Sequence, residues 1–259
     1  MDNIEKKILE KLRNIENTHD VKIIHAIESG SRGWGFAAPN ADYDCRFIYV
    51  HKQEYYLSVF ERREFIEFEL NEVYDIKGYD ISRALNYIVK SQAVINEWLS
   101  SNVSYIKHDA IAAQLKELAS SFFNPIPVCH HYLSLARKML AEIKNSEQAK
   151  IKKYFYILRP IANLNYIHKY NKMPPMEFDK TLKAISMPQD IFSEVEKLKA
   201  QKMVLLEHDK ISSNKILIEY FNSELSLFEE ILKRLCHNKN TNYSLADDLF
   251  RKIIKEAWQ

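Results

Sequence analysis

The stretch that decides the fold is residues 28–49, ESGSRGWGFAAPNADYDCRFIY. It overlaps the end of the apolar run VKIIHAIES at 21–29, which predicts a buried strand, and it contains most of a second strand candidate at 43–50. The chain has only four glycines in 259 residues, and three of them lie between positions 30 and 35. Average usage would give about 18. Glycines so few and so clustered indicate positions where the backbone geometry requires them.

Gly30 and Ser31 stand where the first strand gives way to a turn or a short helix. A glycine beside a small hydroxyl residue at such a junction lets backbone N–H groups approach a phosphate closely, and Arg32 adds a positive charge. The pattern is not a Walker A loop, because no Gly-Lys-Ser/Thr follows. It is not a dinucleotide-binding fingerprint either, because the glycines run G-x-x-G-x-G. Taken alone, such a turn is more often structural than functional.

Two carboxylates, Asp42 and Asp44, open the second strand candidate. Side chains two residues apart on a strand point to the same face, and neighbouring carboxylates repel each other unless a cation neutralises them. Mg²⁺ prefers such oxygen ligands, although a solvent-facing strand end with two acids is also common. Arg46, two residues further on, is expected either to point into the site or to brace a carboxylate.

A third carboxylate, Asp75, lies in the next strand candidate. On an antiparallel neighbour of the second strand it would reach the Asp42–Asp44 pair, and three carboxylates on adjacent strands are typical of a two-metal site. In that arrangement Asp75 would also accept the proton of an attacking hydroxyl. Asp80 competes for this role, but its place immediately before a helix favours an N-cap.

The rest of the chain changes character near residue 125. Before it, the patterns predict a helix at 3–17, a strand candidate at 64–76 with a bulge or a break near Asn71, helices at 81–91 and 93–101, a short strand at 103–108 and a helix at 109–123. After it, only helical patterns follow, at 127–145, 148–171, 178–186, 189–208, 213–237 and 244–257, with Pro160 expected to kink or divide the second of them. The sequence therefore predicts an α+β fold: a domain at 1–122 with a small mixed or antiparallel sheet, and an all-helical domain at 123–259.

Composition excludes several classes of protein. No run of about 18 apolar residues is present, so no transmembrane helix and no membrane partner are expected. The charged N-terminus lacks the apolar core of a secretory signal. Cys45, Cys129 and Cys236 are far apart and unpatterned, which is typical of reduced thiols and favours a cytoplasmic protein. The net charge of +2 neither demands nor excludes nucleic acid.

The long string 28–49, with Gly-Ser followed by Asp-x-Asp, resembles the DNA polymerase β-like nucleotidyltransferase superfamily. Within it, the string is similar to the RNA-ligase-associated polymerase family of RNA repair. Further matches are Asp75-x-x-Gly-Tyr-Asp80, Glu97-Trp98-Leu99-Ser100 and Lys153-Tyr154-Phe155-Tyr156-x-Leu158-Arg159-Pro160. The resemblance covers about residues 21–190. Ala41 and Cys45 depart from the family pattern, but neither changes a carboxylate.

The resemblance implies a nucleotidyltransferase domain followed by helices that close the nucleotide cleft. It implies transfer of a nucleoside monophosphate from an NTP to a hydroxyl, with release of pyrophosphate and two Mg²⁺ ions for which Mn²⁺ would substitute. The family's association with RNA ligases implies an RNA end as acceptor and an RNA ligase as functional associate. The implied metal ligands and catalytic residues are Asp42, Asp44 and Asp75, and the implied nucleotide contacts are Gly30, Ser31, Arg32, Lys152, Lys153, Tyr156 and Arg159.

Other interpretations remain open at this point. Lys152, Tyr156 and Arg159 share one helical face that would meet the triphosphate, or Lys153 would do so if the helix is rotated, but a basic face over core tyrosines is also typical of a solvated helix. A small-molecule or protein acceptor would keep the same chemistry. A catalytically silent nucleotide-binding or antitoxin-like module is the interpretation that lies outside enzymes.

Overall fold

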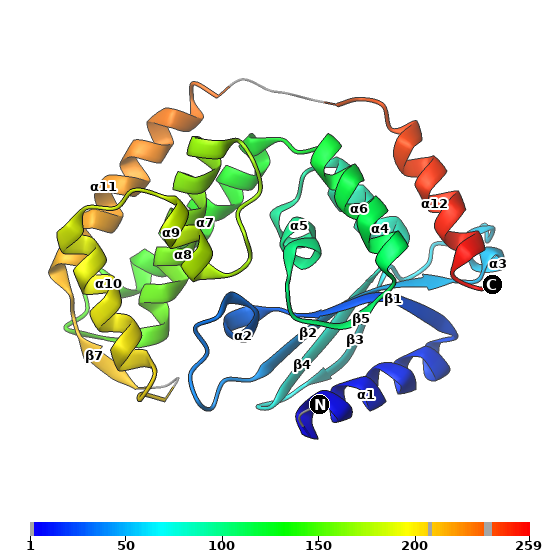
Figure 1. Ribbon diagram of the computed structural model, residues 1–259, viewed down its shortest axis with the longest axis horizontal. Helices are drawn as coiled ribbons and strands as arrows, with labels where there is room; N and C mark the ends of the chain where they lie inside the picture. The colour runs from blue at the N-terminus through cyan, green and yellow to red at the C-terminus, as the bar shows by residue number, and fades with distance from the viewer. Residues whose placement is uncertain (1–2, 207–208, 236–239) are drawn as a thin grey trace. The chain divides into compact units, whose positions relative to one another are not determined.

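The alternating apolar residues of the N-terminal half form a five-stranded sheet in the order β3-β4-β2-β1-β5 (Figure 1). The computed structural model describes residues 3–206, 209–235 and 240–259. Its strands are β1 (Val21–Glu28), β2 (Tyr43–His51), β3 (Phe65–Leu70), β4 (Tyr74–Asp80) and β5 (Ser104–Lys107). The predicted α+β class is confirmed, and the sheet is mixed because β2 and β4 run parallel while the other neighbours are antiparallel.

The prediction that Asp75 lies on an antiparallel neighbour of β2 is wrong. β3 and β4 form a hairpin in which β3 takes the sheet edge, so β4 lies beside β2 and parallel to it. Of the bulge or break predicted near Asn71, the structure shows a break, which is the turn of this hairpin. The Asn71 side-chain oxygen accepts hydrogen bonds from the backbone N–H groups of Val73 and Tyr74, each at 2.8 Å, which ends β3 and starts β4.

One face of the sheet packs against α1 (Asn3–His19), the amphipathic helix predicted at the N-terminus. Its residues Ile8, Leu12 and Ile15 are fully buried among sheet residues such as Phe47 and Tyr49. Burial of an Ile or Leu side chain contributes about 1.5–3 kcal/mol, so this stripe anchors the helix. Because side chains alternate along a strand, the residues between the buried ones in β2 and β4 point to the opposite face of the sheet.

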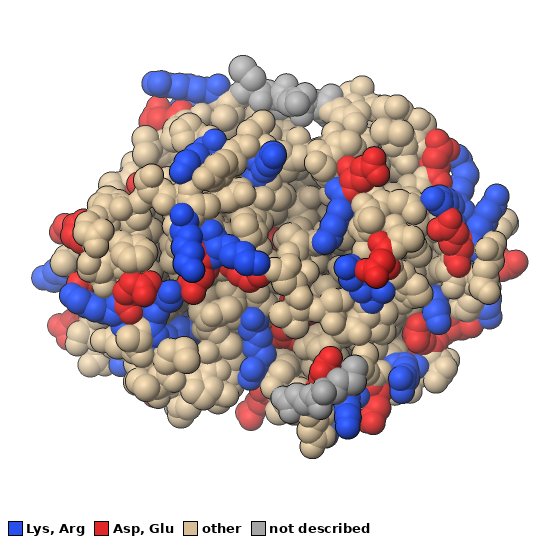
Figure 2. All heavy atoms as spheres, viewed as in Figure 1, with Lys and Arg blue, Asp and Glu red and all other residues tan. Residues whose placement is uncertain are grey.

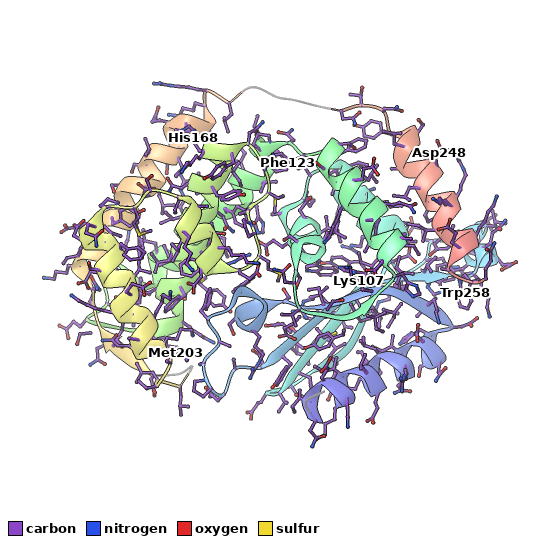
Figure 3. The ribbon with its side chains drawn as sticks, in the orientation of Figure 1. Lys107, Phe123, His168, Met203, Asp248 and Trp258 are labelled. Carbon is purple, nitrogen blue, oxygen red and sulfur yellow. The ribbon has the colours of Figure 1, made fainter. Side chains whose placement is uncertain are left out.

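The opposite side of the sheet contacts α4 (Ile81–Val89), α6 (Asp109–Ser121) and α12 (Ser244–Glu256). Asp80 caps α4 as predicted, since its carboxylate accepts the backbone N–H of Ser82 at 2.8 Å. The C-terminal segment is tied to β2 by Trp258, labelled in Figure 3, whose indole N–H donates to the carbonyl of His51 at 3.0 Å. The short helices α2 (Gly30–Trp34), α3 (Gln53–Tyr56) and α5 (Ala93–Ser100) connect these elements.

The second half of the chain is helical, as predicted, with one exception. Its helices are α7 (Pro125–Ile143), α8 (Ile151–Tyr170), α9 (Phe178–Ala184), α10 (Gln189–Lys202) and α11 (Lys215–Leu232). The exception is a two-stranded antiparallel sheet of β6 (Gln148–Lys150) and β7 (Lys210–Ser212), so "all-helical" is wrong in this detail. Strands of three residues are too short to carry a periodic signal. Pro160 lies inside α8 without dividing it.

The chain forms two compact units that differ from a simple division near residue 122. The first contains the described parts of Met1–Gly33, Asp42–Phe123 and Lys239–Gln259, and the second those of Trp34–Ala41 and Asn124–Asn238. The predicted boundary lies within one residue of the crossing after Phe123. Sequence reasoning did not anticipate that residues 34–41 belong to the helical unit, or that α12 belongs to the sheet unit.

Other composition-based expectations can be compared with the described residues. No described helix combines the length and the apolar character that crossing a membrane requires. Acidic and basic side chains are interspersed over the face shown in Figure 2, as a net charge of +2 suggests. Cys45 and Cys129 are buried free thiols, whereas Cys236 lies outside the described residues.

His25 gives the fold a predictable sensitivity to acid. It is 2% exposed on β1 and contacts the carbonyl of Trp98 at 3.3 Å. Burial lowers its pKa to about 4, with smaller contributions from Lys116 and Lys107 and an opposing one from the Trp98 carbonyl. In the unfolded chain the His25 imidazole therefore becomes protonated near pH 6.5, whereas in the folded chain it stays neutral down to about pH 4.

We expect the free energy of unfolding of the wild type to fall by about 2 kcal/mol between pH 7 and pH 5, relative to His25→Gln. Glutamine has no titrating group, so the difference between the two proteins isolates this one histidine. Chemical denaturation at a series of pH values measures it. A constant difference between the two proteins across that interval would contradict the buried, neutral state of His25.

Candidate active site

The turn after β1 lies directly against the carboxylate of Asp44. Gly30 has a φ of +55°, and a Cβ atom built on it would lie 1.7 Å from Asp44 Oδ2. The backbone N–H of Ser29 donates to the carbonyl of Asp44 at 2.8 Å, and the backbone N–H of Gly33 donates to the carbonyl of Ser29 at 3.0 Å. Glycine is therefore required here for two reasons, a left-handed backbone conformation and the absence of space for a side chain.

Arg46 joins two of the predicted site carboxylates. Asp44 and Asp75 are direct partners in the parallel register of β2 and β4, and they project to the same face. Arg46 Nη2 lies 3.0 Å from Asp44 Oδ1 and 2.7 Å from Asp75 Oδ2, and its Nη1 donates to the Asp75 carbonyl at 2.6 Å. A second cation, Lys77 Nζ, lies 3.5 Å from Asp75 Oδ1. Of the two roles expected for Arg46, the structure shows that of a brace.

Asp42 and Arg32 lie at the entrance of β2. Arg32 Nε donates to the backbone carbonyl of Asp42 at 3.0 Å, and its guanidinium stacks 3.9 Å above the ring of Tyr43. The Asp42 carboxylate is half-buried and forms no hydrogen bond or ion pair with another described residue. Its two oxygens are therefore available to a ligand, in contrast to those of Asp44 and Asp75.

Glu28 is a site residue to which sequence reasoning gave no role. It is 2% exposed at the end of β1, where its Oε1 accepts the backbone N–H of Asp44 at 3.0 Å and its Oε2 accepts the hydroxyl of Tyr105 at 2.5 Å. Burial raises the pKa of this carboxyl to about 7, although both hydrogen bonds oppose the shift. Glu28 thus fixes the backbone of Asp44. An acid that ends an otherwise apolar strand was the available signal.

Asp80, the alternative third carboxylate, is occupied by structural contacts. It is 1% exposed, and besides capping α4 it accepts hydrogen bonds from the hydroxyls of Ser82 at 2.5 Å and Tyr56 at 2.8 Å. It pairs in register with Tyr49, five residues along β2 from the Asp44–Asp75 pair. The geometry therefore favours Asp75 over Asp80 as the carboxylate associated with Asp44.

The donor set can be tested against the cation that the resemblance implies. Asp42 and Asp44 offer carboxylate oxygens two residues apart, which is suitable chemistry for Mg²⁺. Asp75 is held by Arg46 and Lys77, and within the described residues no group of three His, Cys, Asp or Glu side chains is placed to hold a metal ion. The residues therefore fit one cation, held by Asp42 and by Asp44 once Arg46 leaves Asp44 Oδ1. A second ion on Asp75 would also require Arg46 and Lys77 to move.

The predicted nucleotide contacts of α8 lie in the helical unit. Arg159 is 3% exposed, and its guanidinium lies 4.2 Å from the ring centre of Trp34. The ring of Tyr156 meets the same Trp34 edge-on at 5.4 Å. Lys152 is half-buried, and Lys153 forms an ion pair with Glu142 at 2.5 Å. The structure thus brings Tyr156 and Arg159 together at Trp34, within the helical unit.

Removal of the Arg46 brace should show how strongly the carboxylates depend on it. We expect Arg46→Gln to lower the free energy of unfolding by about 3 kcal/mol, because breaking these largely buried ion pairs leaves two like charges facing each other. The double variant Arg46→Gln/Asp75→Asn should recover much of this loss, which a double-mutant cycle measures. Arg62→Gln, at an exposed arginine, is the control. Strictly additive losses in the cycle would contradict the bridging role.

A mixed sheet with a glycine-serine turn packed on an Asp-x-Asp strand is the arrangement of a DNA polymerase β-like nucleotidyltransferase domain. The comparisons agree, because residues 4–252 match the model of the RNA repair pathway DNA polymerase beta family. The chain belongs to that family. It is 33% identical over 256 residues to the uncharacterized protein YcgL of Bacillus subtilis (strain 168), covering 99% of this chain and 98% of that protein.

Among solved structures, the chain is similar to a nucleotidyltransferase-like protein from Exiguobacterium sibiricum. The match covers 96% of this chain and 80% of the other, with 13% sequence identity and a TM-score of 0.30.

Proposed function

We propose that this protein transfers a nucleoside monophosphate from an NTP to a hydroxyl acceptor. The observation that best supports this is the contact between Gly30 and the carboxylate of Asp44. A phosphate received by the backbone amides of the turn would lie beside the carboxylates that hold its counter-ion. In the reaction, the acceptor oxygen attacks the α-phosphorus, the bond from that phosphorus to the bridging oxygen breaks, pyrophosphate leaves, and the hydroxyl proton passes to solvent or to a carboxylate.

Asp42 and Asp44 would hold Mg²⁺, and Mn²⁺ is expected to substitute. A cation bound there supplies positive charge to the triphosphate oxygens and lowers the pKa of the attacking hydroxyl. Arg32, fixed above Tyr43, adds charge on the side of the turn. Glu28 holds the Asp44 backbone through its amide, so the carboxylate is positioned before a ligand arrives, as efficient electrostatic catalysis requires.

For the triphosphate we propose Gly30 and Ser31 in the turn, and Lys152, Lys153, Tyr156 and Arg159 on α8. Arginine binds phosphate oxygens in a fork, and lysine acts as a point charge. The ion pair of Lys153 with Glu142 is partly exposed, at 29% and 40% of the two side chains. Exposed pairs of this kind contribute little to stability, so a triphosphate would compete effectively for the lysine.

The proposed acceptor is an RNA end. The family description, an RNA repair pathway, supports RNA, and a functional association with an RNA ligase would suit a pathway that modifies an end and then joins it. We expect the protein to act in the cytoplasm, where the buried thiols of Cys45 and Cys129 stay reduced.

The test is incubation of the protein with each labelled NTP, Mg²⁺ or Mn²⁺, and RNAs that differ at their 3′ ends. We expect metal-dependent pyrophosphate release together with an RNA product that is longer on a sequencing gel. Pyrophosphate release with a small-molecule or protein acceptor, but with no RNA, would replace the acceptor and keep the chemistry. Absence of release with every NTP and acceptor would indicate a silent nucleotide-binding module instead.

A further inference from the structure

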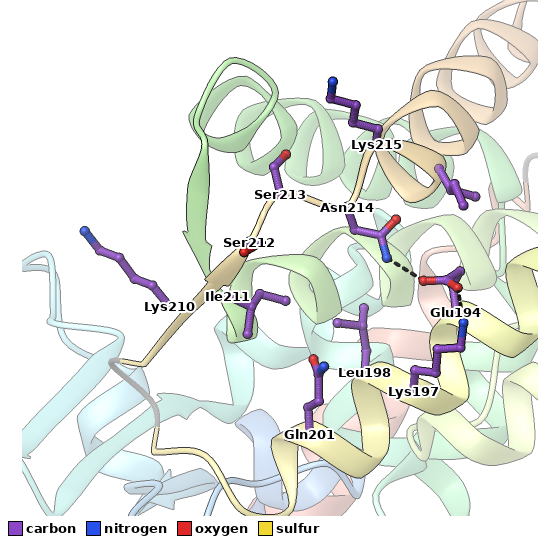
Figure 4. Close-up of a pocket in the computed structure, with 11 residues that line it drawn as sticks. Glu194, Lys197, Leu198, Gln201, Lys210, Ile211, Ser212, Ser213, Asn214 and Lys215 are labelled. Carbon is purple, nitrogen blue, oxygen red and sulfur yellow. Dashed lines mark hydrogen bonds and ion pairs between the residues drawn. The ribbon is translucent and has the colours of Figure 1, made fainter.

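A groove separate from the carboxylates lies in the helical unit, between α10 and the β7–α11 junction (Figure 4). It is open, with a volume of about 700 Å³. Its polar lining comes from both sides, and includes Glu194, Lys197, Gln201, Lys210, Ser212 and Lys215. Three of these six side chains are lysines carried on three different elements, so the groove is predominantly basic.

The acid in the groove is already neutralised. Glu194 accepts a hydrogen bond from Asn214 Nδ2 at 2.7 Å and pairs with Lys197 Nζ at 2.6 Å (Figure 4). Lys210 and Lys215 are exposed, and neither forms an ion pair with an acid among the described residues. In Figure 4 the side chains of Lys210 and Lys215 extend outward, away from α10, so these two lysines keep an uncompensated positive charge at the rim of the groove.

A third lysine reinforces the charge of Lys210. In the β6–β7 pair, Lys150 lies directly opposite Lys210, and directly opposite residues project to the same face of a sheet. Like charges in this position destabilise a strand pair. An anion bound between them would remove that repulsion, so the pairing indicates a negatively charged ligand independently of the groove.

The backbone of β7 offers further donors. The carbonyl of Asp209 and the N–H of Ser213 both bond toward β6, to Ile151 and Glu147. Because the direction of these groups alternates along an antiparallel strand, the amides of Lys210 and Ser212 point to the other edge. Among the residues that the structure describes, no strand pairs with that edge. Amide N–H groups beside lysines and a serine hydroxyl are suitable partners for phosphate oxygens.

We propose that this groove binds the phosphodiester backbone of a single-stranded RNA. Its lining residues lie far along the protein chain from Asp42 and Asp44, which would perform the transfer. The proposal rests on the function proposed above and extends it by assigning the surface that would hold the acceptor strand. The phosphates of an extended RNA strand are spaced along it, which fits lysines that are spread over α10, β7 and α11. A compact anion would instead require these lysines to point toward a single position. The partly exposed Ile216 and Ile211 give the sugars and bases an apolar contact.

The test is a salt titration of RNA binding by fluorescence anisotropy, with a labelled single-stranded RNA and no nucleotide. The variant is Lys210→Gln/Lys215→Gln, and the matched control is Lys180→Gln/Lys183→Gln on α9, which removes the same charge elsewhere in the helical unit. Each lost phosphate contact reduces the slope of log affinity against log salt by about 0.7 for single strands. We therefore expect a slope smaller by about 1.4 and an affinity about tenfold lower at low salt, with the control unchanged.

Equal affinity and slope in the two double variants would overturn the proposal. So would a wild-type protein that binds poly-glutamate at this groove and no RNA, because the edge of β7 would then serve an acidic protein partner. Groove-dependent RNA binding without any pyrophosphate release would remove the proposed reaction and leave this surface standing, and release without RNA binding would do the reverse.

Discussion

Asp42→Asn is expected to reduce nucleotide incorporation at least a thousandfold while the protein remains folded. Loss of one preorganised charge-stabilising group in an active site typically costs about 10²–10³ in rate, and here the lost charge would also hold the metal. The side chain has no described partner whose loss would weaken the fold. The free energy of unfolding should therefore change by no more than about 0.5 kcal/mol. Incorporation is measured in single turnover, and stability by denaturant unfolding.

The matched control for this variant is Asp20→Asn. Asp20 is 71% exposed and pairs with Lys52 at the far end of the sheet from the turn, so the same change of charge should leave incorporation unaffected. Asparagine also tolerates the positive φ of 48° at this position. If Asp42→Asn retains activity within tenfold of the wild type, Asp42 does not hold a catalytic cation, and the proposed chemistry fails at this ligand.

Gly30→Ala is expected to lower incorporation about a hundredfold, with only a modest loss of stability. The new methyl group would overlap Asp44 Oδ2, so the carboxylate has to rotate or the turn has to shift. A displacement of about 1 Å in a catalytic geometry can cost 10²-fold in rate. The left-handed backbone of an alanine costs a further 1–2 kcal/mol or so of folding free energy. The rate at saturating NTP and the melting temperature separate the two effects.

Gly35 provides the control for Gly30. Its φ is +86°, so an alanine there is strained as well, but a Cβ would meet nothing within 4 Å. Gly35→Ala should therefore lose stability without a comparable loss of rate. If both alanine variants lose rate and stability in the same proportion, the effect of Gly30 is backbone strain alone, and its contact with Asp44 has no catalytic consequence.

Local patterns in the sequence predicted most of the elements correctly. The strand before Gly30, the strand after Asp42, the helix at the N-terminus and the cap at Asp80 each depend on residues close together in the chain. The parallel pairing of β2 and β4 does not, because it depends on β3 taking the sheet edge. The predicted direction of β4 was wrong, but the prediction that Asp75 lies beside Asp44 was right. A strand next to β2 can place a residue opposite Asp44 whether it runs parallel or antiparallel.

The electrostatic arrangement of the site was less accessible to sequence reasoning. Whether Arg46 braces a carboxylate depends on the register that places Asp75 opposite Asp44, and register is set by the whole sheet. The buried state of Glu28 depends on Tyr105, which lies 77 residues away. Gly78 is a similar case, because it is required only by the ring of Phe47, 2.2 Å from where its Cβ would be.

The assignment of α12 to the sheet unit has a consequence for biosynthesis. A ribosome releases residues 42–123 early, yet the helix that contacts α4, α6 and β2 emerges only after the whole helical unit has been made. Domains of most proteins mature in order from the N-terminus during translation. Here the sheet unit would stay incompletely covered until translation has passed residue 256. Premature termination within the last helix should therefore yield chains that chaperones retain or proteases remove.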